Sequence, residues 1–427
     1  MLLAIPAPMV FAPLGTAGSP ATIIAMSSTC LWLWYQIQRD HPVTSGVQPV
    51  RAAMIGWLLA MLAVYAHAMA HPISADEISP ADSGLLRLIG MTGIVLVAND
   101  GIRSLAHHRQ LVGSLVIAVG MVALLGVIQT ITKQLWVDRI SIPGLRSGAA
   151  GWELAARSGL VRPSGTSTHP IEFGMVLTTT LPLAMTLARS ASRRRWLYRV
   201  LLIAISISIL LSISRSAMIC AAVAFVVTVS SWPLAAKVWA TASALLVTTV
   251  VFLTMPGVLG TITNLFTGIS SDSSVASRTG SYDVASMFIS RSPLLGRGFG
   301  TFLPKYWILD NGYLGLLIEG GALGLLGLLI VIATAVGCAF RSARIHVHTA
   351  ERGQLDREIA AALVAAVAAG AVGLAFFDTF AFPQSEGVFF LLIGLAGASW
   401  RLSSGERRRL NSPNEAPSRS SVTEANA

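Results

Sequence analysis

The chain has 427 residues, of which 54% are hydrophobic and only 12% are charged. Apolar runs of roughly 17 to 25 residues recur along it, the length that a helix needs to cross a bilayer, so the composition indicates a polytopic membrane protein. The formal charge of +10 does not indicate a nucleic-acid partner, because the arginines gather in short segments between the apolar runs and in the tail, as the positive-inside rule expects.

The apolar runs are continuous, which fits membrane-spanning helices, whereas the strands of a membrane barrel are shorter and alternate in polarity. The predicted fold is therefore all-α, a transmembrane bundle of about 12 helices. Its first span is the least regular, because three prolines interrupt it and it lacks the basic region of a cleaved signal peptide. The expected spans lie near residues 3–17, 20–36, 52–70, 85–100, 110–131, 171–188, 198–213, 216–232, 238–255, 312–336, 358–377 and 385–400.

Arginines in the short loops predict the orientation in the cytoplasmic membrane. One cluster lies at residues 189–199 and another at 341–357, and both are expected in the cytoplasm. If the spans alternate, Arg103, Arg109 and the basic residues after position 400 fall on the same side. Both termini are then cytoplasmic. The long loops at about 132–170 and 256–310 lie outside.

One transmembrane domain is expected over residues 1–402. The segment 403–427 is rich in Ser, Asn, Pro, Glu and Arg, so we expect a disordered cytoplasmic tail. The three cysteines, at positions 30, 220 and 338, lie in or beside apolar runs without ligand-like spacing, which predicts neither a disulfide framework nor a zinc site.

With this topology the ionisable residues of the spans gather toward the outer side. Glu172 begins a span from outside, Arg215 lies at an outer turn, and Asp378 and Glu386 flank the last connection. Glu319 lies within a span, about 12 Å along the helix from residue 311. A charge at such a position is costly unless it faces a wet or protein-lined cavity. The distribution favours a chamber open to one side rather than a path through the membrane.

The second outer loop adds basic residues and a glycine run. After Arg278, apolar side chains at helical spacing within residues 284–289 predict a short amphipathic helix in this outer loop. Arg297 lies inside the run 296–300, whose glycines allow a backbone to approach a ligand. Arginine suits phosphate because its planar fork donates two parallel hydrogen bonds. The run is not a dinucleotide-binding fingerprint, since its spacing is G-x-G-x-G and it joins no strand to a helix.

These motifs follow one another in an order that resembles the bacterial O-antigen polymerase and ligase family. The resemblance covers about residues 160–335, and the layout of the spans extends it over nearly the whole chain. The matching pieces are Arg162-Pro163-Ser164-Gly165-Thr166, His169-Pro170-Ile171-Glu172-Phe173-Gly174, Ser214-Arg215-Ser216-Ala217, the segment from Arg278 to Pro293, Gly296 to Gly300, and Asp310-Asn311-Gly312-Tyr313-Leu314 continuing to Glu319, Gly321 and Gly324.

The resemblance implies glycosyl transfer at the outer face of the cytoplasmic membrane. A glycan would leave an undecaprenyl diphosphate carrier and be joined to a hydroxyl of an acceptor glycan. No metal, cofactor or nucleotide sugar is expected from it, and a chain-length regulator or a flippase is a further candidate partner. Ligases of the family usually carry His where this chain has Asp310, which favours a polysaccharide polymerase.

The working hypothesis is an inverting, metal-independent polysaccharide polymerase. Its candidate catalytic residues are Asp310, Asn311 and Glu319; its candidate diphosphate-binding residues are Arg215, Arg278 and Arg297; and its candidate substrate-binding residues are Arg162, His169 and Glu172. The alternatives are a ligase that moves the glycan to lipid A-core, cell-wall glycan or protein, and a transporter of lipid-linked oligosaccharides.

Each motif also has a purely structural interpretation. Asp310 and Asn311 are favoured residues for capping a helix that begins near Gly312. A carboxyl such as that of Glu319 also serves as a hydrogen-bonded group between helices. Arginines of outer turns and loops snorkel to the interface or bind lipid headgroups. The glycines at 320, 321 and 324 allow close packing of helices.

Overall fold

The computed structural model describes residues 3–38, 48–147, 155–157, 159–192, 194–255, 257, 260, 261, 263, 273–345 and 350–411. In this part of the chain there are 12 α-helices, and eight of them are long and apolar enough to cross a membrane. The predicted all-α polytopic class is confirmed. The helices are α1 Pro20–Ile37, α2 Pro49–Met69, α3 Ala75–Gly101, α4 Leu105–Thr132, α5 Pro170–Ser190, α6 Arg195–Leu211, α7 Arg215–Ser230, α8 Leu234–Thr254, α10 Ser273–Arg291, α11 Gly312–Arg344, α12 Ala350–Leu374 and α13 Pro383–Asn411.

Local sequence explains where the helices begin. Serine side chains accept a backbone hydrogen bond at the starts of α1, α4 and α7, and prolines occupy the first helical position of α1, α2, α5 and α13. Both are favoured there, because the first turn of a helix has unsatisfied N–H groups and proline has none to satisfy. α13 continues to Asn411, beyond the predicted domain boundary at residue 402, and residues 412–427 lie outside the described part.

The predicted first span over residues 3–17 is wrong. This segment forms the strand β1 (Met9–Val10) and the 3-10 helix η1 (Ala12–Gly18), because its prolines remove backbone donors that a spanning helix needs. It packs against the loop-bearing end of the bundle instead, with Leu3 and Met9 buried. The Ala7 N–H donates to the Thr166 carbonyl at 2.8 Å, and β1 pairs antiparallel with β2 (Arg146–Ser147). The remaining two strands, β3 (Ala156–Arg157) and β4 (Leu160–Val161), form a second small hairpin.

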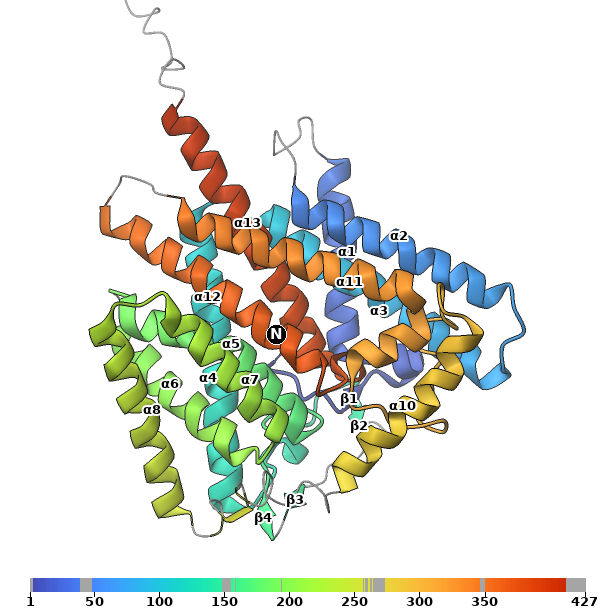
Figure 1. Ribbon diagram of the computed structural model, residues 1–427, viewed down its shortest axis with the longest axis horizontal. Helices are drawn as coiled ribbons and strands as arrows, with labels where there is room; N and C mark the ends of the chain where they lie inside the picture. Colours follow the sequence, from blue (N-terminus) through green and yellow to red (C-terminus); the bar gives the residue numbers. More distant parts are fainter. Residues whose placement is uncertain are drawn as a thin grey trace, which may run out of the picture.

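The helices form two groups that share α12 and α13 (Figure 1). One group contains α1, α2, α3 and α11, and the other contains α4 to α8. α5 is the centre of the second group: 94% of its apolar window is buried, against 6% for α8, which lies at the edge of the molecule. Most of the surface of α8 is therefore exposed and would contact lipid.

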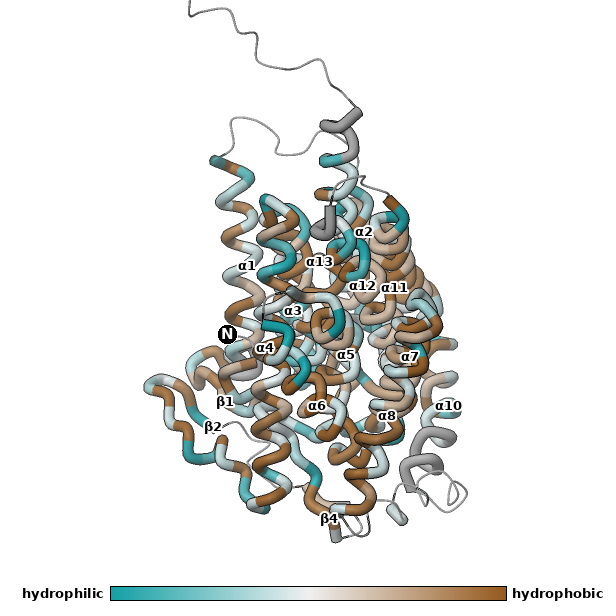
Figure 2. Tube along the Cα trace, turned by 90° about the vertical axis from the view of Figure 1, so that its left-hand side faces the viewer, coloured by the Kyte–Doolittle hydropathy of each residue, from teal (hydrophilic) through white to brown (hydrophobic). Residues whose placement is uncertain are grey.

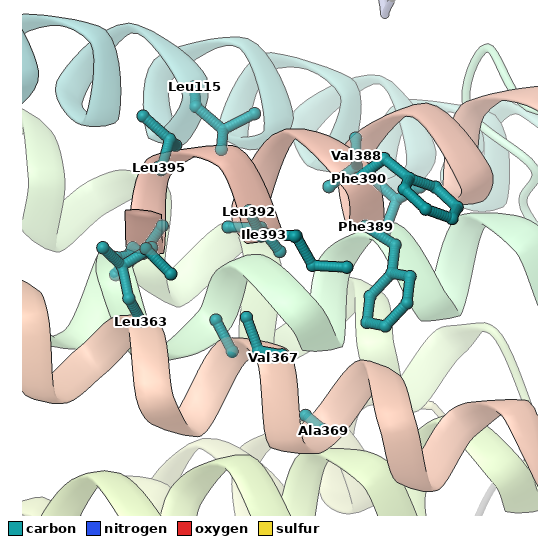
Figure 3. Close-up of a cluster of buried hydrophobic side chains, with 14 of the residues drawn as sticks. Leu115, Leu363, Val367, Ala369, Val388, Phe389, Phe390, Leu392, Ile393 and Leu395 are labelled. Carbon is teal, nitrogen blue, oxygen red and sulfur yellow. The ribbon is translucent and has the colours of Figure 1, made fainter. Parts of the chain in front are cut away.

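Close packing, rather than a hydrophobic driving force, holds helices together in lipid. Figure 3 shows Leu363 and Val367 of α12 beside residues of α13 such as Ile393, with Leu115 of α4 on the other side of α13. Glycines let the helices approach: a Cβ on Gly370 would collide with the ring of Phe389. The bundle core thus depends on small residues facing large ones.

α11 is broken at Gly321, whose φ of +60° and ψ of −165° are outside helical geometry. The break frees backbone groups that a membrane bundle cannot leave unsatisfied. The loop of residues 293–298 supplies their partners. The N–H groups of residues 297 and 298 donate to the carbonyls of 318 and 319 at 3.1 and 2.8 Å, and the carbonyls of 293 and 294 accept from the N–H groups of 322 and 323 at 2.9 and 3.1 Å. These four backbone hydrogen bonds therefore hold the loop against the break in α11.

The two ends of the bundle differ in charge. The arginine-rich loops meet at one end, where Arg109 pairs with Asp356 at 3.5 Å and Arg189 with Glu358 at 3.4 Å. The strands and the described parts of the long loops lie at the other end, which is the lower one in Figure 2, and α13 runs upward from it. Since residues 3–18 lie with these loops, the chain enters α1 from there, which differs from the expectation that both termini share one side. When the predicted first span is left out, the later spans still alternate in direction across the membrane as expected from the sequence.

We expect Gly321→Val to lower the free energy of unfolding by about 3 kcal/mol, because valine at this φ and ψ is strained and its Cβ would collide with the Leu294 backbone. Thermal unfolding of the purified protein in detergent checks this. Gly315→Ala is the matched control in the same helix: a Cβ there meets nothing within 4 Å, so stability should be unchanged or slightly raised. Equal effects of the two substitutions would contradict the role of the break.

Candidate functional site

Two short helices meet at the loop-bearing end of the bundle. α6 and α7 have 17 and 16 residues, about 25 Å each, which is less than the hydrocarbon thickness of a bilayer. Their connection therefore lies below the ends of longer neighbours such as α4, which has 28 residues. In this turn the buried Ile213 has a φ of +46°, an unfavourable conformation for a β-branched residue. The strained turn places Arg215 at the first position of α7, with Ser214 as its cap.

Arg162 contacts the turn between α6 and α7. Its Nε donates to the carbonyl of Ser212 at 2.8 Å, so the guanidinium covers the end of α6, where a positive charge is favourable. The loop that carries Arg162 is held by the buried Gln129 of α4. The amide oxygen of Gln129 accepts from the N–H groups of Ser164 and Gly165 at 3.2 and 2.8 Å, and its nitrogen donates to the Gly165 carbonyl at 2.9 Å. Sequence reasoning missed Gln129, which was only a polar residue in an apolar run.

His169 and Glu172 begin α5 beside this loop. The His169 Nδ1 accepts from the Ile171 N–H at 3.2 Å, so His169 is the cap of α5. Burial and the nearby charge of Arg162 lower the pKa of His169 to about 4, which keeps the ring neutral at pH 7. The fully buried Glu172 accepts from the N–H groups of Thr168 and Gln384, both at 2.8 Å. Glu172 thereby ties the start of α5 to the start of α13.

The start of α11 faces the connection between α12 and α13. Asn311 caps α11, with its Oδ1 accepting from the Leu314 N–H at 3.0 Å, so the cap does not use Asp310. Gly312 packs against α12: a Cβ there would meet the Leu374 side chain and the carbonyl of Phe377. The carboxylate of Asp310 lies close enough to Asp378 for its charge to raise the pKa of Asp378.

Aromatic rings connect the start of α5 to the α12–α13 connection. Phe377 and Phe382 stack with centroids 4.8 Å apart, and the His169 ring lies 6.2 Å from Phe382. Phe377 also packs with Cys220 of α7, about 7.5 Å along the helix from residue 215. The connection of residues 375–382 thus packs against two helices: α7, which begins at Arg215, and α11, which begins just after Asp310 and Asn311.

Arg297 is held on the opposite rim. Its Nη2 donates to Glu77 of α3 at 2.5 Å, and its guanidinium lies 5.0 Å from the ring of Phe288 and 4.9 Å from that of Tyr306. Tyr306 also donates to Glu77. The predicted amphipathic helix is α10, and Ala285 on its apolar face packs against Ile318 of α11. The side chain of Arg278, in the same helix, lies outside the described residues.

Glu319 lies just before the break in α11, where its Oε1 accepts from the Phe302 N–H at 3.0 Å. It therefore fastens the glycine loop to the helix. Arg87 of α3 is the cation nearby: it donates to Glu386 at 3.2 Å, and its charge acts on Glu319 and Asp378. Sequence analysis did not select Arg87, although an arginine at the start of an apolar run was a signal available in the sequence.

Burial raises the pKa of Asp378 to about 6, and the positive charge of Arg87 opposes this shift. The structure thus places eight of the nine candidate residues at one end of the bundle. His169 and Asp310 lie beside the connection of residues 375–382, and Arg162 and Arg215 lie at the turn between α6 and α7. Asn311, Glu172, Glu319 and Arg297 make the hydrogen bonds or ion pairs that hold the surrounding segments.

The comparison with known families agrees with the motifs. Residues 200–330 match the family model described as O-Antigen ligase. The matched segment runs from α6 into α11, so it contains Arg215, Arg297, Asp310 and Glu319, and it ends before the α12–α13 connection. The resemblance to the O-antigen ligase and polymerase family is thereby confirmed over this part of the chain. No curated protein matches the chain.

We expect Gln129→Leu to lower the free energy of unfolding by on the order of 3 kcal/mol, because it leaves buried backbone donors and acceptors of the Arg162 loop unpaired. Gln134→Leu, an exposed position just beyond the same helix, should change stability by no more than about 0.5 kcal/mol. Thermal unfolding of both purified variants checks the difference. Similar unfolding temperatures would show that Gln129 does not hold the loop.

The raised pKa of Asp378 predicts a pH dependence of stability. A carboxyl whose pKa is higher in the folded than in the unfolded state stabilises the fold below its unfolded value of 3.8, and this contribution is lost as the pH rises through about 6. Asp378→Asn keeps an oxygen that accepts from the Phe380 N–H and removes the charge. The unfolding temperature of the wild type, relative to this variant, should therefore fall between about pH 4 and 6. Parallel pH curves would contradict the shift.

Proposed function

We propose that the protein transfers a glycan from an undecaprenyl diphosphate carrier to the hydroxyl of an acceptor glycan, polymerising oligosaccharide repeats at the outer face of the cytoplasmic membrane. One observation carries the proposal. Arg215 and Asp310 begin two different helices that pack on the same connection, residues 375–382, at the end of the bundle opposite the arginine-rich loops. A cationic group and a carboxylate thus lie at the ends of two helices that pack on one connection.

The cationic side suits the leaving group. Arg215 combines its own charge with the positive end of the α7 dipole, which together favour an anion. Arg162 adds a second guanidinium at the end of α6. Arg297 is oriented by Glu77 through Nη2, which leaves its other guanidinium nitrogens for a diphosphate oxygen. Arg278 is a further phosphate ligand in this proposal.

The acidic side suits the acceptor. In the reaction the acceptor oxygen attacks the anomeric carbon from the face opposite the diphosphate, and the bond from that carbon to the diphosphate oxygen breaks. Its electron pair leaves with the diphosphate, whose charge the arginines stabilise. Asp310 takes the hydroxyl proton as general base. The sugar carbon is inverted, and this scheme uses no metal. Asn311 and Glu319 position Asp310 and the glycine loop.

The neutral ring of His169 and the stacked rings of Phe377 and Phe382 form a surface for the sugar. Aromatic faces and neutral hydrogen-bonding groups suit a carbohydrate, which carries many hydroxyls and no charge of its own. Glu172 acts in this proposal by holding the α5 and α13 ends around that surface.

We expect Asp310→Asn and Arg215→Ala each to lower the rate at which purified protein extends a synthetic undecaprenyl-diphosphate-linked repeat into a ladder, by about 100-fold or more. Gel separation of the products measures the rate. Asp283→Asn, exposed on α10, and Arg103→Ala, exposed at the other end, are the matched controls and should leave the ladder unchanged. Full activity of both site variants at normal expression would refute the assigned roles.

The family description favours a ligase as the second candidate. The two functions differ in the acceptor, since a polymerase joins repeats to one another and a ligase joins the finished glycan to another molecule. Analysis of the linkage made by the purified protein, with carrier-linked repeat alone and then with added lipid A-core, separates them. Product formed only with the second acceptor would replace the polymerase by the ligase.

A further inference from the structure

The end of the bundle opposite the candidate site contains a cavity of about 980 Å³ between α4, α5, α6 and α12. It is lined by four arginines from different segments, and no carboxylate is among its lining residues in the described part of the chain. They are Arg109 of α4, Arg189 of α5, and Arg194 and Arg195 at the start of α6. The reaction proposed above uses none of them.

We propose that this cavity binds the phosphate headgroup of an anionic phospholipid of the inner leaflet. The carboxylates next to it, Asp356 and Glu358, are each already paired with one arginine, at 3.5 and 3.4 Å. Two of the four positive charges are therefore matched in the protein. Among the residues that the structure describes, Arg194 and Arg195 have no acidic partner within 4.0 Å, so the lining keeps an excess positive charge.

The start of α6 strengthens the attraction for an anion. Arg194 is the N-cap residue in a left-handed conformation, with a φ of +62°, and its side chain makes no capping hydrogen bond. The first N–H groups of this 17-residue helix lie beside the cavity-lining residues Arg195 and Tyr198 without a side-chain cap. Helix N–H groups, the dipole and guanidinium groups together are the chemistry that binds phosphate.

The surrounding aromatic residues place the cavity at headgroup depth. Trp196, at the start of α6, and Trp239, near the start of α8, are each 74% exposed, and α8 is the helix whose sides face lipid. Trp232 lies under Arg189, with the guanidinium 4.7 Å from its ring, and lines an adjoining cavity of about 620 Å³. Exposed tryptophans mark the membrane interface. Leu187 in the lining offers an apolar surface where an acyl chain would begin.

The position also favours a lipid over a soluble anion. The cavity opens at the level of the membrane interface, and basic pockets between helices on the cytoplasmic side attract the headgroups of anionic lipids. A free phosphate would use the same arginines but would gain nothing from the tryptophans or from Leu187. The proposal is independent of the transfer reaction, because it concerns the opposite end of the bundle.

The test measures lipid retention by the full-length purified protein. Native mass spectrometry compares bound phosphatidylglycerol and phosphatidylcholine of identical acyl chains for the wild type and for Arg194→Gln/Arg195→Gln. We expect the wild type to retain phosphatidylglycerol preferentially, and the double variant to lose about thirty-fold in affinity, or about fivefold per arginine. Arg103→Gln, an exposed residue of the same end outside the cavity, should bind as the wild type does.

The same experiment tests whether the variants fold and whether the bound anion is a lipid headgroup or free phosphate. Arg194→Lys/Arg195→Lys should restore most of the retention, and the single Arg194→Gln replaces the double variant if the latter is not monodisperse. Millimolar inorganic phosphate should not displace the lipid. Equal retention by wild type and glutamine variants, equal binding of phosphatidylcholine, or displacement by inorganic phosphate or by an acidic peptide would overturn the proposal.

Discussion

The need to satisfy every backbone polar group inside a membrane bundle governs the region around the candidate site. A helix that breaks at Gly321 would leave carbonyl and N–H groups without partners, at a cost of several kcal/mol each in hydrocarbon. The loop of residues 293–298 supplies them, and this fixes the glycine run beside α11. Arg297 is consequently placed by backbone hydrogen bonds before its own side chain makes any contact. A break in one helix and a loop from another segment form a single structural unit.

The same requirement explains the buried polar side chains. Gln129, Glu172 and Glu319 each pair with backbone N–H groups of a loop, and each thereby fixes a segment that carries or adjoins a candidate site residue. Such groups are costly when unpaired and stabilising when every partner is present. These hydrogen bonds fix the conformation of loops that have no regular secondary structure. The residues proposed to contact substrate, Arg215 and Asp310, begin helices whose neighbours are held in this way.

Charge is distributed unequally between the two ends. At one end arginines line a cavity beside exposed tryptophans, as expected for the cytoplasmic interface. At the other, Arg87, Glu386, Asp378 and Asp310 form a cluster of both signs, and burial raises the pKa of Asp378 to about 6. In the two proposals, one end binds anionic lipid and the other carries out acid–base and phosphate chemistry, with an apolar core between them.

The sequence by itself determined the helical class, the order of the helices after residue 18, and the motifs that place Arg215 and Asp310 at helix starts, because hydropathy, capping residues and arginine-rich loops are local signals. It did not predict that residues 3–18 form no spanning helix, that Arg87 pairs with Glu386, or that Gln129 holds the Arg162 loop. These pairs are separated by 299 and 36 residues. Only the tertiary structure decided them, since which distant groups meet depends on how the helices pack and on where a broken helix finds its missing hydrogen bonds.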